Sequence, residues 1–229
     1  MRKPNLWTMN AKLFLMVGCV AGIVSACMHE KSDDKSDIQQ IVRGLMLGAD
    51  SLMQSDSLFW NKPIDKLHPR VCIHDSLIRQ KLDSALALCP DKQTYLLKYR
   101  YLFQSWHLEE VLDLLREMDV RMSDSMSSEL LHLKAMLEDY RGDTLTARKD
   151  FLRADSAYTI KIQQVAQDSL MYGFARIEKA LNLSLMQNDF RPLREEIAFY
   201  ERVHSSSING IEQWKQISDK ATYYRKMFE

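Results

Sequence analysis

The sequence predicts an all-α protein built of antiparallel helical hairpins. Apolar residues recur at intervals of three and four through most of the chain, a spacing that gathers them on one face of a helix. Residues that start or cap helices separate these periodic stretches. Glycine and proline are scarce, with 7 and 5 among 229 residues, and alternating β-branched runs are few, which favours helix over sheet.

The predicted elements begin with an N-terminal helix. Residues 38–74 hold this helix, around Ile41 and Leu45, and then an irregular connection that contains two prolines. Residues 75–88 predict one helix, and helical apolar faces continue to the C-terminus. These faces are marked by Leu96, Tyr99, Phe103, Leu108, Val111, Leu115, Leu130, Leu133, Leu137, Ala147, Phe151, Ala154, Leu170, Phe174, Ile177, Leu193, Ile197, Ile211, Trp214 and Tyr224.

Short polar side chains mark the joints between these helices. Asp91, Asp143 and Asp189 are predicted N-caps, because an aspartate oxygen accepts a hydrogen bond from an unpaired backbone N–H at a helix start. Pro192 is tolerated only in a first helical turn, which places the start of its helix near Asp189.

The N-terminal residues predict an export signal. The charges before position 27 are Arg2, Lys3 and Lys12, all basic, and an apolar run from Leu13 to Val24 follows. This order is typical of a secretory signal peptide, here residues 1–26. The run is shorter than the roughly 20 residues that a membrane-spanning helix needs.

Val24-Ser25-Ala26-Cys27 closes this segment and resembles the lipobox of bacterial lipoproteins. The resemblance implies cleavage before Cys27 and acylation of that residue on its thiol and its amine. Two or three acyl chains anchor a protein stably, whereas one alone is marginal. The alternative is an ordinary signal peptide with a cysteine nearby by chance.

Residues 27–37 are polar and predict a flexible tether. Met28 is not the aspartate that retains enterobacterial lipoproteins in the inner membrane, so the resemblance implies a lipid anchor in the outer membrane, at its periplasmic face or at the cell surface. The cluster Ser32-Asp33-Asp34 resembles the acidic surface-export signal of Bacteroidetes lipoproteins, although a solvated linker explains it equally well.

The charge balance of the mature chain limits the class of partner. Cleavage would remove three of 31 basic residues and none of 31 acidic ones, which leaves 28 against 31 and argues against nucleic acid as a partner.

Cys72 and Cys89 flank the predicted helix 75–88, which would separate them by roughly 20 Å. A disulfide requires Cα atoms within about 7 Å, so both thiols are expected to be free and mostly buried.

A repeat signature surrounds Gly142. Ala135, Gly142, Ala147, Phe151 and Ala154 stand at spacings of 7, 5, 4 and 3 residues, similar to the skeleton of the tetratricopeptide repeat. The resemblance implies a short right-handed solenoid of stacked hairpins over residues 75–205, with a C-terminal capping helix over residues 206–229. An unrelated bundle of helical hairpins is the alternative.

The neighbouring repeats are divergent. His107 takes the turn position of the preceding repeat, and Asn188 takes that of the following one. Asn188 comes 46 residues after Gly142 rather than 34, so residues 155–169 are expected to lengthen a helix or to insert a turn.

The same resemblance implies a partner-binding face on the first helix of each hairpin. An ordinary amphipathic surface is the competing interpretation for each residue of this face. The candidates are Glu129, His132, Met136, Asp139 and Tyr140, with Tyr101, Gln104 and Ser105 from the weaker preceding repeat.

The leading hypothesis is a non-catalytic scaffold or adaptor that binds an unidentified envelope protein or peptide. The sequence carries no catalytic, metal-binding or cofactor-binding motif that would specify a reaction. The alternative is a sensor or binding lipoprotein for a small molecule, peptide or glycan, with Trp60, Trp106 and Trp214 as pocket candidates. An enzyme with a site assembled from distant residues is the third hypothesis.

Overall fold

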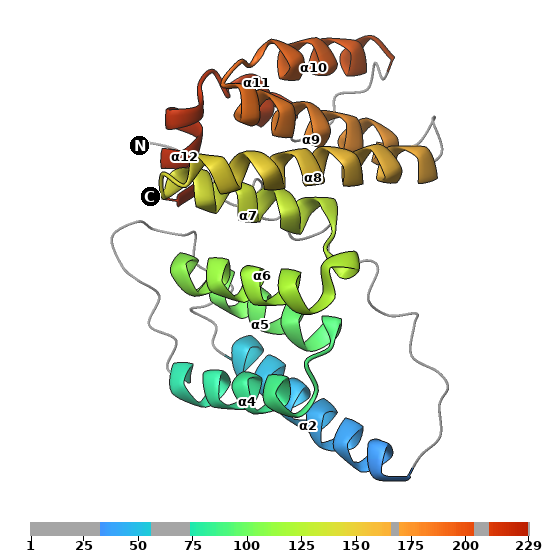
Figure 1. Cartoon of the computed structure of the whole chain (residues 1–229), viewed down its shortest axis with the longest axis vertical. Helices are drawn as coiled ribbons and strands as arrows, with labels where there is room; N and C mark the ends of the chain where they lie inside the picture. The colour runs from blue at the N-terminus through green and yellow to red at the C-terminus, as the bar shows by residue number, and fades with distance from the viewer. Residues whose placement is uncertain (1–32, 56–73, 166–169, 204–210, 229) are drawn as a thin grey trace, which may run out of the picture. The chain divides into compact units, whose positions relative to one another are not determined.

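A computed structural model describes residues 33–55, 74–165, 170–203 and 211–228 (Figure 1). All regular structure in these ranges is helical, without a strand, so the predicted all-α class is confirmed. The chain forms two compact units, Met1–Ser125 and Met126–Glu229. The predicted signal peptide, Cys27, Trp60 and Cys72 lie outside the described residues.

In its described residues, 33–55 and 74–125, unit 1 holds four α-helices and a final 3-10 turn. Helix α2 begins inside the predicted tether, so the prediction of a flexible segment is wrong for residues 33–37. This stretch contains neither glycine nor proline, so no residue stops the amphipathic helix from extending backwards. The elements are α2 (Asp33–Ser55), α4 (Asp75–Leu88), α5 (Lys92–Gln104), α6 (Leu108–Met122) and η1 (Ser123–Ser125).

The core of unit 1 follows the predicted apolar faces. Ile78, Leu82 and Ala85 of α4 are fully buried, as are Val111 and Leu115 of α6. Each set is spaced by three or four residues and therefore shares one helix face. The prediction of one helix over 75–88 is confirmed by the bounds of α4.

Unit 2 continues the helical hairpins. Helix α8 has 21 residues against 15 in α6, so the predicted lengthening after position 155 is confirmed as far as Gln164. The elements are α7 (Ser128–Tyr140), α8 (Thr144–Gln164), α9 (Leu170–Gln187), α10 (Arg191–Val203), α11 (Ile211–Lys215) and α12 (Lys220–Phe228).

The described residues of the C-terminal segment, 211–228, form two short helices, so the prediction of a single capping helix is wrong. The N–H of Ile217 donates to the carbonyl of Trp214 at 3.1 Å and closes a turn after α11. Asp219 Oδ1 then accepts from the N–H of Thr222 at 2.8 Å and caps α12. This side-chain acceptor offers the backbone a new helix start in place of continuation.

Three hairpins turn with the same geometry. Trp106, Gly142 and Asn188 follow α5, α7 and α9, and all three have positive φ angles, of 67°, 91° and 52°. The N–H of each donates to the carbonyl three residues earlier, and the next N–H donates to the carbonyl five residues earlier. This pair of bonds is the Schellman ending of a helix. Gly142 and Asn188 are confirmed as turn residues, whereas the first turn lies at Trp106, one residue before the predicted His107.

The cap predictions hold for the first two aspartates. Asp91 accepts from the N–H of Thr94, and Asp143 accepts from that of Thr146. Asp189 instead accepts from the N–H of Arg191, the first residue of α10. It therefore lies one residue before the cap position, and its predicted place was wrong by one residue.

The three alanines and the phenylalanine of the repeat signature are buried, at the packing of α7 against α8. Ala135 and Ala154 are fully buried, Ala147 is 1% exposed and Phe151 is 2% exposed. Because alanine side chains end at Cβ, the two helices can approach closely, and the phenylalanine ring fills the space that remains.

Gly173 of α9 permits a comparably close approach to α10. A Cβ atom there would lie 1.9 Å from Cε2 of Tyr200. We expect Gly173→Ala to lower the free energy of unfolding by about 1–3 kcal/mol, although alanine favours a helix interior by roughly 1 kcal/mol. Urea unfolding followed by circular dichroism measures the change. The matched control is Gly44→Ala in α2, where a Cβ meets no atom within 4 Å and stability should not fall. Equal stability of the two variants would contradict the prediction.

Candidate partner-binding face

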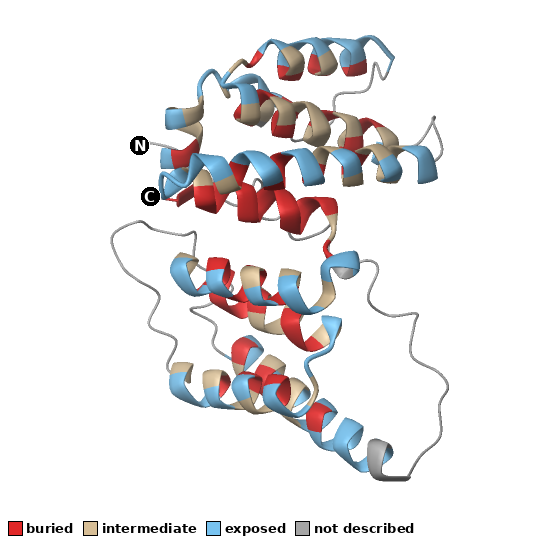
Figure 2. Ribbon diagram, in the orientation of Figure 1, coloured by how far each residue is buried: buried red, intermediate tan, exposed pale blue. Residues whose placement is uncertain are grey.

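The predicted partner-binding residues do not form one open surface. Helix α7 is buried along nearly its whole length (Figure 2). Met136 is fully buried, His132 is 3% exposed, and Tyr140 alone among the predicted residues of α7 is exposed, at 42%. Glu129 is buried, and Asp139 is intermediate. The partner-binding role of these residues stays a prediction, but the accessible part of the face lies at the C-terminal end of α7.

Tyr101 belongs to the core of unit 1. Its hydroxyl donates to Asp75 at the start of α4, which also accepts from Nε of Arg79 at 3.0 Å. Burial by itself raises the pKa of Asp75, but these two hydrogen bonds outweigh it and hold the pKa below its ordinary value. Tyr101 therefore joins α5 to α4.

The position of the turn after α5 explains why Tyr101 lies in the core. Because the turn after α5 lies at Trp106 rather than at His107, each repeat position in α5 moves back by one residue. Arg100 then takes the place that was assigned to Tyr101, and it forms an ion pair with Asp50 of α2. Gln104 is half-buried, and Ser105 is buried.

His132 points into the interior of unit 2. Nδ2 of Asn182 donates to the carbonyl of Phe151 at 2.9 Å, which leaves Oδ1 of Asn182 to accept from Nδ1–H of His132 at 2.8 Å. The imidazole also meets the rings of Phe151 and Tyr158 edge-on. Burial lowers the pKa of His132 to about 4. The side chain is therefore a neutral, oriented donor at physiological pH and is not offered to a partner.

Glu129 is part of an ion network that joins three helices. Nζ of Lys161 in α8 pairs with Glu129 of α7 and, at 3.1 Å, with Glu178 of α9. Burial raises the pKa of both carboxyl groups, and Lys161 reverses this effect for Glu129. The pKa of Glu178 stays raised, because the charge of Glu129 adds to the effect of burial. The two carboxylates thus share one cation, and the network holds α7, α8 and α9 together.

Asp139 and Tyr140 contact the chain's own C-terminal helix. Asp139 Oδ2 accepts from the hydroxyl of Tyr224 at 2.7 Å and pairs with Nζ of Lys220 at 2.8 Å. The ring of Tyr140 lies 5.1 Å from that of Phe228 and meets that of Tyr224 edge-on. Burial and the bond to Asp139 raise the pKa of Tyr224, so its hydroxyl stays protonated and donates. The predicted partner position at the end of α7 is therefore filled by α12.

The preceding short helix extends this contact to α9 and α10. Trp214 of α11 meets Phe174 of α9 edge-on, at 6.2 Å between ring centroids. Nζ of Lys215 pairs with Glu201 of α10. None of these contacts, nor those of α12, was predicted from the sequence. Ser218-Asp219 is a helix-cap signal, however, and it marks the break between the two helices.

Comparison of the chain with models of protein families, with curated proteins and with solved structures found no match. Its function is therefore inferred from its residues and their contacts.

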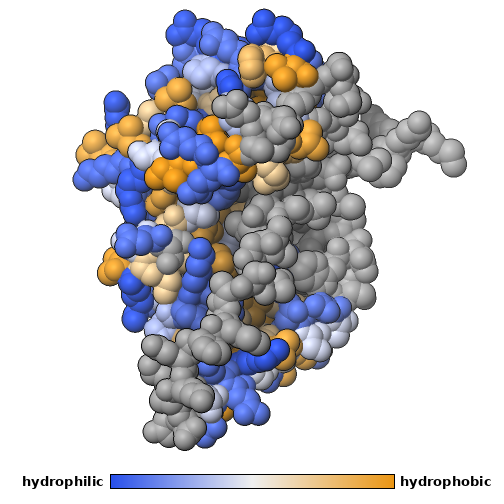
Figure 3. Space-filling view, turned by 90° about the vertical axis from the view of Figure 1, so that its right-hand side faces the viewer, coloured by the Kyte–Doolittle hydropathy of each residue, from blue (hydrophilic) through white to orange (hydrophobic). Residues whose placement is uncertain are grey.

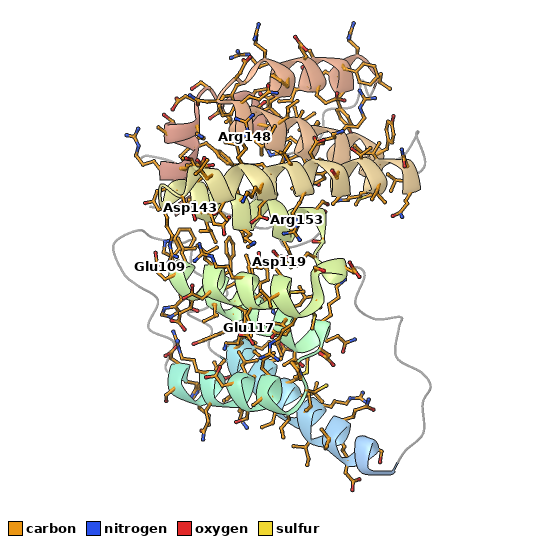
Figure 4. All side chains as sticks on the ribbon, in the orientation of Figure 1. Glu109, Glu117, Asp119, Asp143, Arg148 and Arg153 are labelled. Carbon is orange, nitrogen blue, oxygen red and sulfur yellow. The ribbon has the colours of Figure 1, made fainter. Side chains whose placement is uncertain are left out.

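Several charged side chains elsewhere on the described helices have structural partners. Glu117, labelled on α6 in Figure 4, accepts from the hydroxyl of Tyr95 at 2.8 Å and pairs with Arg121 at 3.0 Å. Arg153 of α8, also labelled, pairs with Asp150 at 3.0 Å. Within the described ranges, His, Cys, Asp and Glu side chains form no group of three that could hold a metal ion.

The described surface mixes polar and apolar side chains. On the face that Figure 3 presents, hydrophobic and hydrophilic residues are interspersed. In the part of the chain that the structure covers, no helix combines the length and the apolar content that crossing a membrane requires.

Two tryptophans of the alternative hypothesis, Trp106 and Trp214, lie in the described residues and pack against aromatic neighbours. The ring of Trp106 lies 6.3 Å from that of Phe103 in unit 1, between centroids, and Trp214 contacts Phe174 edge-on in unit 2. These contacts show aromatic packing within each unit, and the sensor hypothesis stays a prediction.

Proposed function

We propose that this chain is a lipid-anchored, non-catalytic scaffold or adaptor of the bacterial cell envelope, built of helical hairpins that resemble tetratricopeptide repeats. The observation that carries the proposal is the recurrence of one hairpin geometry at Trp106, Gly142 and Asn188. Repeated hairpins present successive helices side by side, and such arrays serve as surfaces for peptides and partner helices.

The engagement of its polar groups supports binding over catalysis. His132 is neutral and hydrogen-bonded to Asn182, and Lys161 is shared by two carboxylates. A catalytic acid, base or nucleophile must be able to reach a substrate. These groups instead bond to one another inside unit 2.

The sequence around Cys27 supports the anchor. The lipobox resemblance and the preceding apolar run imply lipid on this cysteine and attachment to the outer membrane. The lipid on Cys27 would then hold the helical hairpins at the membrane.

A site-specific crosslink tests the proposed function. A photoreactive amino acid replaces Tyr140, which is 42% exposed at the end of α7, in the full-length protein expressed in its native envelope. We expect one crosslinked partner of fixed mass. The matched control carries the same group at Leu145, which is 78% exposed at the start of α8 and should give no such product. Absence of a product at position 140, or equal products at both positions, would contradict the scaffold.

The same cells test the anchor. In Cys27→Ala, labelling with radioactive palmitate should be lost and the protein should leave the membrane fraction, whereas Cys89→Ala should retain both properties. Labelling that survives the Cys27 substitution would contradict lipidation at this residue.

A further inference from the structure

Helix α12 presents three side chains on one face to the end of α7. Lys220, Tyr224 and Phe228 stand at positions i, i+4 and i+8 and therefore lie above one another along the helix. Lys220 and Tyr224 contact the carboxylate of Asp139, and Tyr224 and Phe228 contact the ring of Tyr140.

The receptor half of this contact is chemically specific. Asp139 offers a carboxylate whose side chain is only 6% exposed, and it is satisfied jointly by a cation and a hydroxyl. Such charge-assisted hydrogen bonds to a buried acceptor depend on geometry, because losing either donor leaves part of the charge unsolvated. Tyr140 offers an aromatic surface for a second ring.

Helix α12 behaves as a docked peptide rather than as a self-sufficient element. It has nine residues, and a helix this short is unstable in water without tertiary packing. Tyr224, Met227 and Phe228 are each at most 6% exposed, whereas Ala221, Arg225 and Lys226 are exposed. This is the pattern of an amphipathic helix laid on a receptor surface.

We propose that the end of α7 is a helix-binding site that α12 fills in cis, and that the partner replaces α12 with a helix of the same chemistry. That partner helix carries a lysine or arginine at i, a tyrosine at i+4 and an aromatic residue at i+8. The inference deepens the proposed scaffold function and rests on it, because it names what the scaffold recognises and what regulates access to the site.

A labelled peptide tests the site directly. The probe is a synthetic peptide of residues 216–229 with fluorescein at its N-terminus, titrated into the full chain while fluorescence anisotropy is measured. Wild type should bind weakly, because α12 competes in cis. The variant Phe228→Ala, whose own α12 has lost the closer of its two ring contacts with Tyr140, should bind the peptide at least about tenfold more tightly, since weakening a cis competitor raises the binding-competent fraction.

Two matched controls make the result specific. Arg225→Ala changes an exposed residue of the same helix and should bind the peptide as weakly as wild type does. Adding Asp139→Asn to the Phe228→Ala chain keeps a hydrogen-bond acceptor but removes the charge, and it should weaken binding of the peptide. Circular dichroism melts confirm that each variant is folded.

Three outcomes overturn the inference. The first is equal peptide affinity for wild type and a folded Phe228→Ala chain, and the second is binding that ignores Asp139→Asn. The third is a dimer in which two copies exchange α12, seen by size-exclusion chromatography with light scattering, because the occupant would then be a second copy. If the peptide binds but no partner is crosslinked at Tyr140, the proposed scaffold function is contradicted and the helix-binding site at the end of α7 still stands.

Discussion

Replacing Lys134 with methionine is expected to lower the free energy of unfolding by about 3–5 kcal/mol. Nζ of Lys134 lies 2.7 Å from Oδ2 of Asp150, and the two side chains are 7% and 4% exposed. Methionine can occupy the space of the lysine stem, so the loss comes from the charge and not from a cavity. Asp150 keeps its bond to Arg153, whose own side chain is 41% exposed, but one of its oxygens loses a buried cation.

Urea unfolding at pH 7, followed by circular dichroism, measures this loss. The matched control is Lys149→Met, an exposed lysine of α8, which should change stability by less than about 0.5 kcal/mol. The double variant Lys134→Met, Asp150→Leu removes both charges and should recover most of the lost stability. If the free energy of unfolding of the single variant stays within about 1 kcal/mol of that of wild type, the prediction that this ion pair matters strongly for stability is wrong.

The second large effect is a loss of stability on mild acidification that depends on His132. Burial lowers the pKa of His132 to about 4, against about 6.5 for an unfolded chain. Between these values the unfolded state binds the proton and the folded state does not, so acid favours unfolding. The stabilisation that the neutral His132 gives the folded state is fully present above pH 6.5. It declines as the pH falls and is lost below pH 4. Between pH 7 and pH 5 the wild type should therefore lose about 2 kcal/mol through this group.

The variant His132→Asn isolates the pH dependence of stability that His132 causes. Its Nδ2 stands near the place of Nδ1 and can still donate to Asn182, but it does not titrate. We expect the variant to be less stable than wild type at pH 7, because the ring volume is lost, and the difference to shrink by about 2 kcal/mol at pH 5. The lowered pKa of Glu129 acts only below its ordinary value of 4.5 and is common to both proteins. Parallel stability curves from pH 7 to pH 5 would contradict a buried neutral histidine.

Features that depend on a few neighbouring residues could be predicted from the sequence. The apolar faces of α4 and α6, the turn at Gly142 and the caps at Asp91 and Asp143 follow from periodicity and short side-chain hydrogen bonds. The turn at Trp106 could not be predicted in this way, because a bulky residue is unfavourable at positive φ and gives no turn signal.

The candidate face was harder to predict because its occupant lies far away in the sequence. Periodicity placed Asp139 and Tyr140 at the end of the correct helix, but it carries no information about a contact with α12. The inward position of His132 did have a signal. Leu130, Leu131 and Leu133 lie on different sides of α7, and apolar residues on more than one face of a helix indicate burial on more than one side.

The bond between Asp139 and Tyr224 joins residues 85 positions apart, and this separation orders events during export. The turn at Gly142 closes over five residues, so the α7–α8 hairpin needs only local contacts, which form early. A chain that the proposed signal peptide sends across the membrane emerges with its N-terminal end first, so α7 reaches the envelope before α12. An envelope partner therefore meets Asp139 and Tyr140 before α12, their competitor within the chain, has emerged.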